Sequence, residues 1–98
     1  MSKIEKLFKK LSRRPTPADV LFDEVDKLLK AYNFKLRQPT GGSSHYTYTH
    51  HDLPDILTIA KNKNKVRAVY VRSAIKSIEK LLELHGGGEK WIKKIYIE

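Results

Sequence analysis

Apolar residues recur along this chain at two spacings, a helical one towards its two ends and an alternating one in its middle. Spacings of three and four residues dominate residues 17–32 and 70–85, which is the period of an amphipathic helix. Between these segments apolar and polar residues alternate one by one, which is the period of a strand with one buried face. This order predicts an α+β fold in which helices cover one face of a small antiparallel sheet.

The strongest helical pattern has residues with known positional preferences at both ends. Thr16 is predicted to be the N-cap and Pro17 the first helical residue, and Asn33 is predicted to end the helix. The apolar stripe of this helix is predicted to contain Ala18, Leu21, Phe22, Val25, Leu28, Leu29 and Tyr32. A stripe of that length must pack against another part of the protein.

Two further helices and a tail complete the predicted organisation. A short helix is predicted over residues 2–12, and a last helix from Tyr70 to His85. The sequence thus divides into a basic helical extension (1–15), the main domain (16–85) and a glycine-rich break with a tail (86–98). The apolar positions of the tail fit a strand as well as a helical turn, and the sequence leaves its structure open.

Three strands are predicted, over Phe34–Gln38, Ser44–His50 and Ile56–Ala60, in an α-β-β-β-α sandwich. Alternation assigns the bulky side chains to the helix side, namely Phe34, Leu36, Tyr46, Tyr48, Leu57 and Ile59. The opposite, open face then receives Lys35, Arg37, His45, Thr47, Thr49 and Thr58. This second set contains cations, hydroxyls and an imidazole but no acid, which suits contact with phosphate and ribose.

The charge of the chain narrows the class of partner. Twenty Lys and Arg against eleven Asp and Glu give a formal charge of +9, which favours a polyanion, either nucleic acid or an anionic membrane. No apolar run is long enough to span a bilayer and the first residues lack a signal-peptide pattern, so a cytoplasmic protein is expected. Without cysteine there is no thiolate chemistry, and no cofactor or metal is predicted.

The segment 41–50 joins a turn rich in glycine and serine to the alternating strand, with His45 at the entrance. Glycine lets backbone NH groups approach a phosphate closely, and imidazole transfers protons near neutral pH. Cations lie on both sides of the segment in sequence. The predicted RNA-binding residues are Lys35, Arg37, Gly42, Ser43, Ser44, Lys61, Lys63, Arg67 and Arg72. As an alternative, the segment is an ordinary hairpin edge whose histidine bonds to its own turn.

Three stretches in this order resemble a known family: Gly42-Ser43-Ser44-His45-Tyr46, Leu57-Thr58-Ile59, and 65–72 at the start of the last helix. Over residues 17–82 the chain resembles the HicA toxins of bacterial type II toxin-antitoxin systems. HicA proteins are small basic mRNA-cleaving ribonucleases with a fold like a double-stranded RNA-binding domain, and a HicB antitoxin neutralises them. The resemblance implies metal-independent RNA cleavage with His45 as the catalytic residue, and an acidic HicB-like partner protein.

Other functions also fit the residues. A non-catalytic RNA-binding domain of the same fold would need the cations and the open face, but it would tolerate loss of His45. A membrane-surface or protein-interaction module would instead use the basic amphipathic residues 2–14. His50, His51 and Asp52 form a possible metal cluster, for which a polar turn is the simpler interpretation. If His51 shared the face of His45, it would supply a second acid or base.

Overall fold

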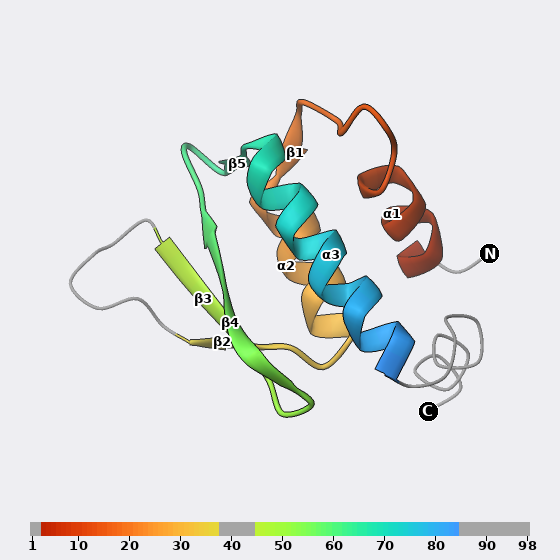
Figure 1. Cartoon of the computed structure of the whole chain (residues 1–98). Helices are drawn as coiled ribbons and strands as arrows, with labels where there is room; N and C mark the ends of the chain where they lie inside the picture. Colours follow the sequence, from red (N-terminus) through yellow and green to blue (C-terminus); the bar gives the residue numbers. More distant parts are fainter. Residues whose placement is uncertain (1–2, 38–44, 85–98) are drawn as a thin grey trace.

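The helices lie on one side of a three-stranded antiparallel sheet, and the other side of the sheet is open (Figure 1). The structure, a computed structural model, describes residues 3–37 and 45–84. In chain order the elements are α1 (Lys3–Leu11), β1 (Val20–Leu21), α2 (Phe22–Ala31), β2 (Lys35–Arg37), β3 (His45–His50), β4 (Leu53–Ala60), β5 (Lys65–Val66) and α3 (Ala68–Leu84). The predicted α+β class and antiparallel sheet are confirmed.

The sheet has the strand order β2-β3-β4, with antiparallel pairing throughout. In its register Arg37 faces Thr47 across β2 and β3, and His45 faces Ala60 across β3 and β4. A tight turn joins β3 to β4, so β4 starts earlier than predicted and includes Pro54. An edge strand tolerates proline because one side of its backbone has no partner in the sheet.

Strand alternation sorts the side chains as predicted. The buried or partly buried set, under the helices, is Phe34, Leu36, Tyr46, Tyr48, Leu57 and Ile59. On the open face Lys35, Arg37, His45 and Thr58 are exposed, and Thr47 and Thr49 are half-buried. Tyr48 therefore belongs to the core and the partly buried Tyr46 packs against it, so neither side chain lies on the open face.

A second, two-stranded sheet was not predicted. Val20 of β1 pairs with Val66 of β5, and both side chains are buried in the common core. This pairing puts residues 20–21 in extended conformation, where a helix was predicted. Ala18 and Leu21, two predicted members of the helical stripe, are exposed as a result.

The helix α2 consequently begins at Phe22, and the predicted N-cap and first helical residue, Thr16 and Pro17, lie outside it. Leu21 occupies the N-cap position, and its amide donates a hydrogen bond to Glu24 Oε1 at 3.0 Å. A carboxylate at this position satisfies an amide that has no partner within the helix and interacts favourably with the helix dipole. The sequence-based start was wrong because the β1–β5 pairing holds residues 20–21 in extended conformation, and the later start is then capped by Glu24 from inside the first turn.

The predicted end of this helix is confirmed. Asn33 has a φ of 68°, a left-handed conformation that asparagine adopts more readily than most residues. The following amide, of Phe34, donates to the carbonyl of Leu29 at 3.1 Å, and the Asn33 amide donates to Lys30 at 3.0 Å. These bonds satisfy the last carbonyls of α2 and direct the chain into β2.

The amino-terminal helix α1 is also confirmed, and its apolar side packs onto α2 and α3. Leu11 is only 2% exposed and belongs to the main core, and the Phe8 ring lies 6.2 Å from that of Tyr32. Lys10 Nζ lies 2.6 Å from Glu24 Oε2, so the carboxylate that caps α2 also binds α1. No helix in the described ranges is long and apolar enough to cross a membrane.

Candidate nucleic-acid interface

His45 is the first residue of β3, and its exposed side chain lies on the open face of the sheet. Because Arg37 faces Thr47, it is diagonal to His45, and such positions are about 7–8 Å apart in an antiparallel pair. The imidazole can accept or release a proton near neutral pH, and the guanidinium is always charged. Together these groups suit proton transfer beside a phosphate.

The open face continues from this pair along the sheet. Lys35 faces Thr49 across β2 and β3, and Thr47 faces Thr58 across β3 and β4. On β2 and on β3 from His45 to Thr49, the side chains of this face include no carboxylate. A phosphate backbone lying here would meet positive charge and hydroxyl groups without a repelling acid.

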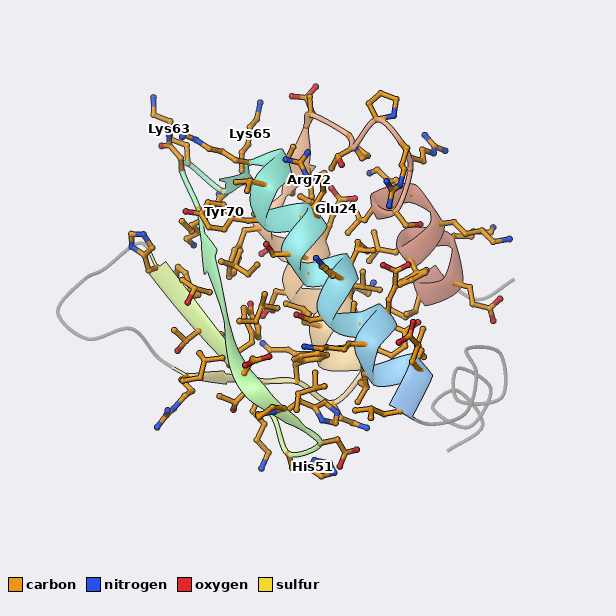
Figure 2. The ribbon with its side chains drawn as sticks, in the orientation of Figure 1. Glu24, His51, Lys63, Lys65, Tyr70 and Arg72 are labelled. Atoms are coloured by element: carbon orange, nitrogen blue, oxygen red, sulfur yellow. The ribbon has the colours of Figure 1, made fainter. Side chains whose placement is uncertain are left out.

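A small hollow opens where the chain leaves β4, and Figure 2 labels two of its residues, Lys65 and Tyr70. The hollow encloses about 140 Å³ and is lined by Ala60, Lys61, Asn62, Lys65, Arg67 and Tyr70. The described lining residues include three cations, an amide and a phenol but no acid, and these groups are donors that bind phosphate oxygens. Ala60 faces His45 across β3 and β4, so the hollow lies at the β4 edge level with His45, and its Lys61 packs on the helix side of the sheet.

Lys61 is held at the rim of this hollow by two aromatic rings. Its Nζ lies 4.8 Å from the ring centroid of Phe22 and 5.0 Å from that of Tyr46. The two rings are themselves 4.7 Å apart, so the ammonium lies over a packed aromatic pair. Cation–π attraction of this kind restricts a flexible lysine without neutralising its charge.

A rigid turn forms another wall of the hollow. Asn62 and Lys65 exchange two backbone hydrogen bonds, of 2.9 and 3.0 Å. The two residues between them have positive φ, 52° at Lys63 and 68° at Asn64, as a tight hairpin turn requires. Lys65 Nζ also lies 3.6 Å from Asp19 Oδ1, but both side chains are largely exposed and such a pair is weak.

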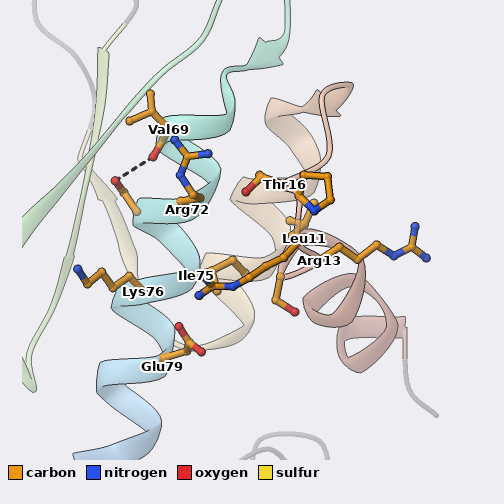
Figure 3. Close-up of a pocket in the computed structure, with 12 residues that line it drawn as sticks. Leu11, Arg13, Thr16, Val69, Arg72, Ile75, Lys76 and Glu79 are labelled. Carbon is orange, nitrogen blue, oxygen red and sulfur yellow. Dashed lines mark hydrogen bonds between the residues drawn. The ribbon is translucent and has the colours of Figure 1, made fainter.

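The structure separates the predicted RNA-binding residues into groups. Those on the open face or at the hollow and its turn are Lys35, Arg37, Lys61, Lys63 and Arg67. Arg72 instead lines a groove with Arg13, between α3 and the segment after α1 (Figure 3). The last three predicted contacts, Gly42, Ser43 and Ser44, lie outside the described residues.

Three polar residues of the hollow were not among the predicted RNA-binding residues, namely Asn62, Lys65 and Tyr70. Lys65 is positioned by the β1–β5 pairing, which has no periodic signal in the sequence. Tyr70 is half-buried, in the first turn of α3, as expected for a tyrosine with a packed ring and a polar edge. Tyr70 lines the hollow because the turn and the start of α3 meet in space, which the sequence does not show.

His50 is a structural residue. It is 4% exposed, its Nε2 lies 3.0 Å from the carbonyl oxygen of Tyr32, and its Nδ1 accepts a hydrogen bond from the Asp52 amide at 3.0 Å. These bonds assign the neutral ring with its proton on Nε2. The prediction of a polar pair lining the turn therefore holds for the exposed His51 but is wrong for His50.

The same residues are the possible metal cluster. Ligand atoms of His50, His51 and Asp52 lie within 4.8 Å of one another, but a metal would have to displace one of the two hydrogen bonds of His50. His51 instead stacks on His50, with ring centroids 4.7 Å apart. It lies at the far end of β3 from His45, roughly 15–20 Å away at the rise of a strand. It is not a second proton-transfer group beside His45.

The fold and the interface define a small basic α+β protein with an acid-free sheet face and an adjoining cation-lined hollow. Comparison of the chain with protein-family models, curated proteins and solved structures finds no match. Its function is therefore inferred from its own residues and their arrangement.

Proposed function

We propose that this protein is an endoribonuclease in which His45 is the catalytic residue. The observation that carries the proposal is the strand register around His45, which puts Arg37 diagonally across β2 and β3 from it and Ala60, a residue at the cation-lined hollow, directly opposite. A phosphate bound beside Arg37 on the open face would meet positive charge there, with its ribose next to the imidazole. Cations placed where charge develops are the commonest means of lowering such a barrier.

The reaction is an internal transesterification of RNA. His45 accepts the proton of the ribose 2′-hydroxyl, the 2′-oxygen bonds to phosphorus, and the bond from phosphorus to the 5′-oxygen breaks. The departing 5′-oxygen takes a proton from water, so the products are a 2′,3′-cyclic phosphate and a 5′-hydroxyl. Arg37 stabilises the added negative charge on the crowded phosphate, and the cations of the hollow attract the RNA to this edge of the sheet. This chemistry requires neither a thiolate nor a metal.

The resemblance of residues 17–82 to HicA toxins makes the proposal more specific. It supports a fold like that of a double-stranded RNA-binding domain and a role as the mRNA-cleaving toxin of a type II system, whose expression arrests growth. The expected partner is an acidic HicB-like antitoxin. By covering the open face, such a partner would hide His45 and neutralise the surrounding cations.

A non-catalytic RNA-binding domain is the second candidate, because the cations of the hollow would bind phosphate with or without an imidazole nearby. A membrane-surface role for the basic amino-terminal residues has less support. The apolar side of α1, which would have to enter the bilayer, contributes to the protein's own core.

The proposed function is tested by RNA cleavage and by the chemistry of the product ends. Purified full-length protein is incubated with a labelled single-stranded RNA and with the same RNA carrying a 2′-deoxyribose at the cleaved position. The proposal predicts cyclic-phosphate ends on the first RNA and no cleavage of the second. Binding of both RNAs without cleavage of either would instead support the non-catalytic domain.

A further inference from the structure

A second basic surface lies on the helix side of the protein, away from the open sheet face. It is a groove of about 660 Å³ between α3 and the segment that follows α1 (Figure 3). Residues 11–16 form one wall, and positions 69, 72, 73 and 76 of α3 form the other. These four positions fall on a single face of the helix, so the groove runs along it.

The charged residues of the groove are mostly basic. Arg13 and Arg14 lie on the first wall, Arg72 and Lys76 lie on α3, and Glu79 is the one acid among the described lining residues. Within residues 3–37 and 45–84, none of the four cations forms an ion pair. Their charge is therefore available to an anionic partner.

The rest of the lining is largely apolar. Leu11 and Ile75 are 2% and 7% exposed and close the groove towards the core. Val69 also lines the groove and is 52% exposed, so it offers apolar surface to a ligand. The groove thus combines basic groups with an apolar contact surface, and none of its described lining residues is aromatic.

We propose that this groove docks an acidic, amphipathic polypeptide segment of a partner protein, with its apolar side chains against Val69 and its carboxylates on the arginines. Charge complementarity favours the acidic residues, and the half-exposed valine favours apolar ones between them. Single-stranded RNA fits less well, because bases bind by stacking on aromatic rings and an apolar floor does not replace the water around a phosphate.

This surface is distinct from the proposed RNA-binding face. His45 lies on the side of the sheet that the helices leave open, whereas the groove lies within the helix layer. A segment bound in the groove leaves His45 uncovered. The proposal does not depend on ribonuclease activity. It assigns part of the affinity of a partner protein to a site outside the open sheet face.

The test uses a fluorescein-labelled helical peptide of glutamates with leucines three and four residues apart, titrated with the full chain at physiological salt. The double variant Arg13→Glu/Arg14→Glu and the single variant Val69→Asp alter the groove. Lys6→Glu/Lys27→Glu makes the same change in net charge on exposed lysines elsewhere. A peptide with the same composition but scrambled leucine spacing reports on binding by charge alone.

We expect the arginine variant to weaken peptide binding at least tenfold and Val69→Asp at least fivefold, with less than a twofold effect of the lysine variant. Affinity for a labelled single-stranded RNA should change less than twofold in the arginine variant. Equal losses for the arginine and lysine variants would overturn the proposal, because binding would then follow net charge alone. A loss of RNA binding with peptide binding unchanged would identify the groove as a nucleic-acid site.

Discussion

The buried hydroxyl of Tyr48 donates a hydrogen bond to Asp26 Oδ1 at 2.7 Å and so joins the middle strand of the sheet to α2. Asp26 also binds Lys30 at 3.0 Å along the helix. Burial raises the pKa of Tyr48 above its ordinary value of 10.0, and the hydrogen bond and charge of Asp26 raise it further. The folded state therefore holds the phenolic proton more tightly than the unfolded chain does.

This relationship makes stability depend on pH in the alkaline range. Tyr48 makes its full contribution to the free energy of unfolding below about pH 10, the pKa of tyrosine in the unfolded chain. As the pH rises above that value, the contribution falls by about 1.4 kcal/mol per pH unit. Tyr48→Phe should cost about 1.5–3 kcal/mol at pH 8, the usual range for a hydrogen bond to a charged group. Urea unfolding at pH 8 to 11 should show that the difference in unfolding free energy between the wild type and Tyr48→Phe shrinks above pH 10. A constant difference would refute the dependence on the Tyr48 proton.

Glu24 provides the corresponding test in acid. Burial raises the pKa of its carboxyl, but hydrogen bonds from Lys10 and the Leu21 amide outweigh this and lower the pKa below 4.5. Its stabilising effect is therefore present above pH 4.5 and lost as the pH falls below it. We expect Glu24→Gln to cost about 0.5–2 kcal/mol at pH 7, as for loss of a helix cap.

The same substitution in the exposed last turn of α3, Glu83→Gln, is the control for Glu24→Gln and should have an effect within about 0.5 kcal/mol. Unfolding at pH 7 and pH 3 measures both variants. If Glu24→Gln lowered the free energy of unfolding by the same amount at pH 3 as at pH 7, the carboxylate would not be the source of the stabilisation.

His50 should matter for stability and not for metal binding. His50→Leu removes the bonds to Tyr32 and Asp52 and is expected to cost about 1–3 kcal/mol, because it leaves a buried carbonyl without its donor. Addition of Zn²⁺ should leave the melting temperature of the wild type unchanged, since both ring nitrogens are already engaged. A rise in Tm with zinc that His50→Leu abolishes would instead establish a metal site.

RNA affinity should fall steeply with salt. For single strands the slope of log K against log salt is about −0.7 per phosphate contact, so removal of one contact by Arg37→Ala should reduce it by about 0.7. Lys65→Ala at the hollow should have a similar effect, and Lys27→Ala on the exposed side of α2 none. Equal slopes of log K against log salt for the wild type and Arg37→Ala would show that Arg37 does not contact an RNA phosphate.

The sequence predicted those parts of the fold that have a repeating pattern. Alternation around Tyr46 and Tyr48 predicted which face of β3 is buried, and helical spacing predicted α1 and α3 to within a few residues. The sequence did not predict β1 and β5. Strands as short as Val20–Leu21 and Lys65–Val66 show no periodicity, and they pair across a long stretch of chain. The start of α2 was misplaced for the same reason.

The candidate site was predicted to a similar extent. His45, Lys35 and Arg37 followed from strand parity, because each side chain is assigned by its own strand. The hollow did not follow from strand parity, because its wall is formed by a turn and the start of a helix that meet only in three dimensions. The burial of His50 was foreseeable, since it shares the parity of Tyr46 and Tyr48.

The central claim, that His45 transfers a proton during RNA cleavage, is tested most directly by a single-turnover cleavage assay with enzyme in excess over a labelled RNA. His45→Ala and the polar variant His45→Gln are compared with the wild type, with RNA affinity and unfolding measured in parallel. We predict a loss of at least 100-fold in cleavage rate for both variants, within the range for removal of a general acid or base, with affinity and folding retained. Cleavage at the wild-type rate by either folded variant would contradict the account.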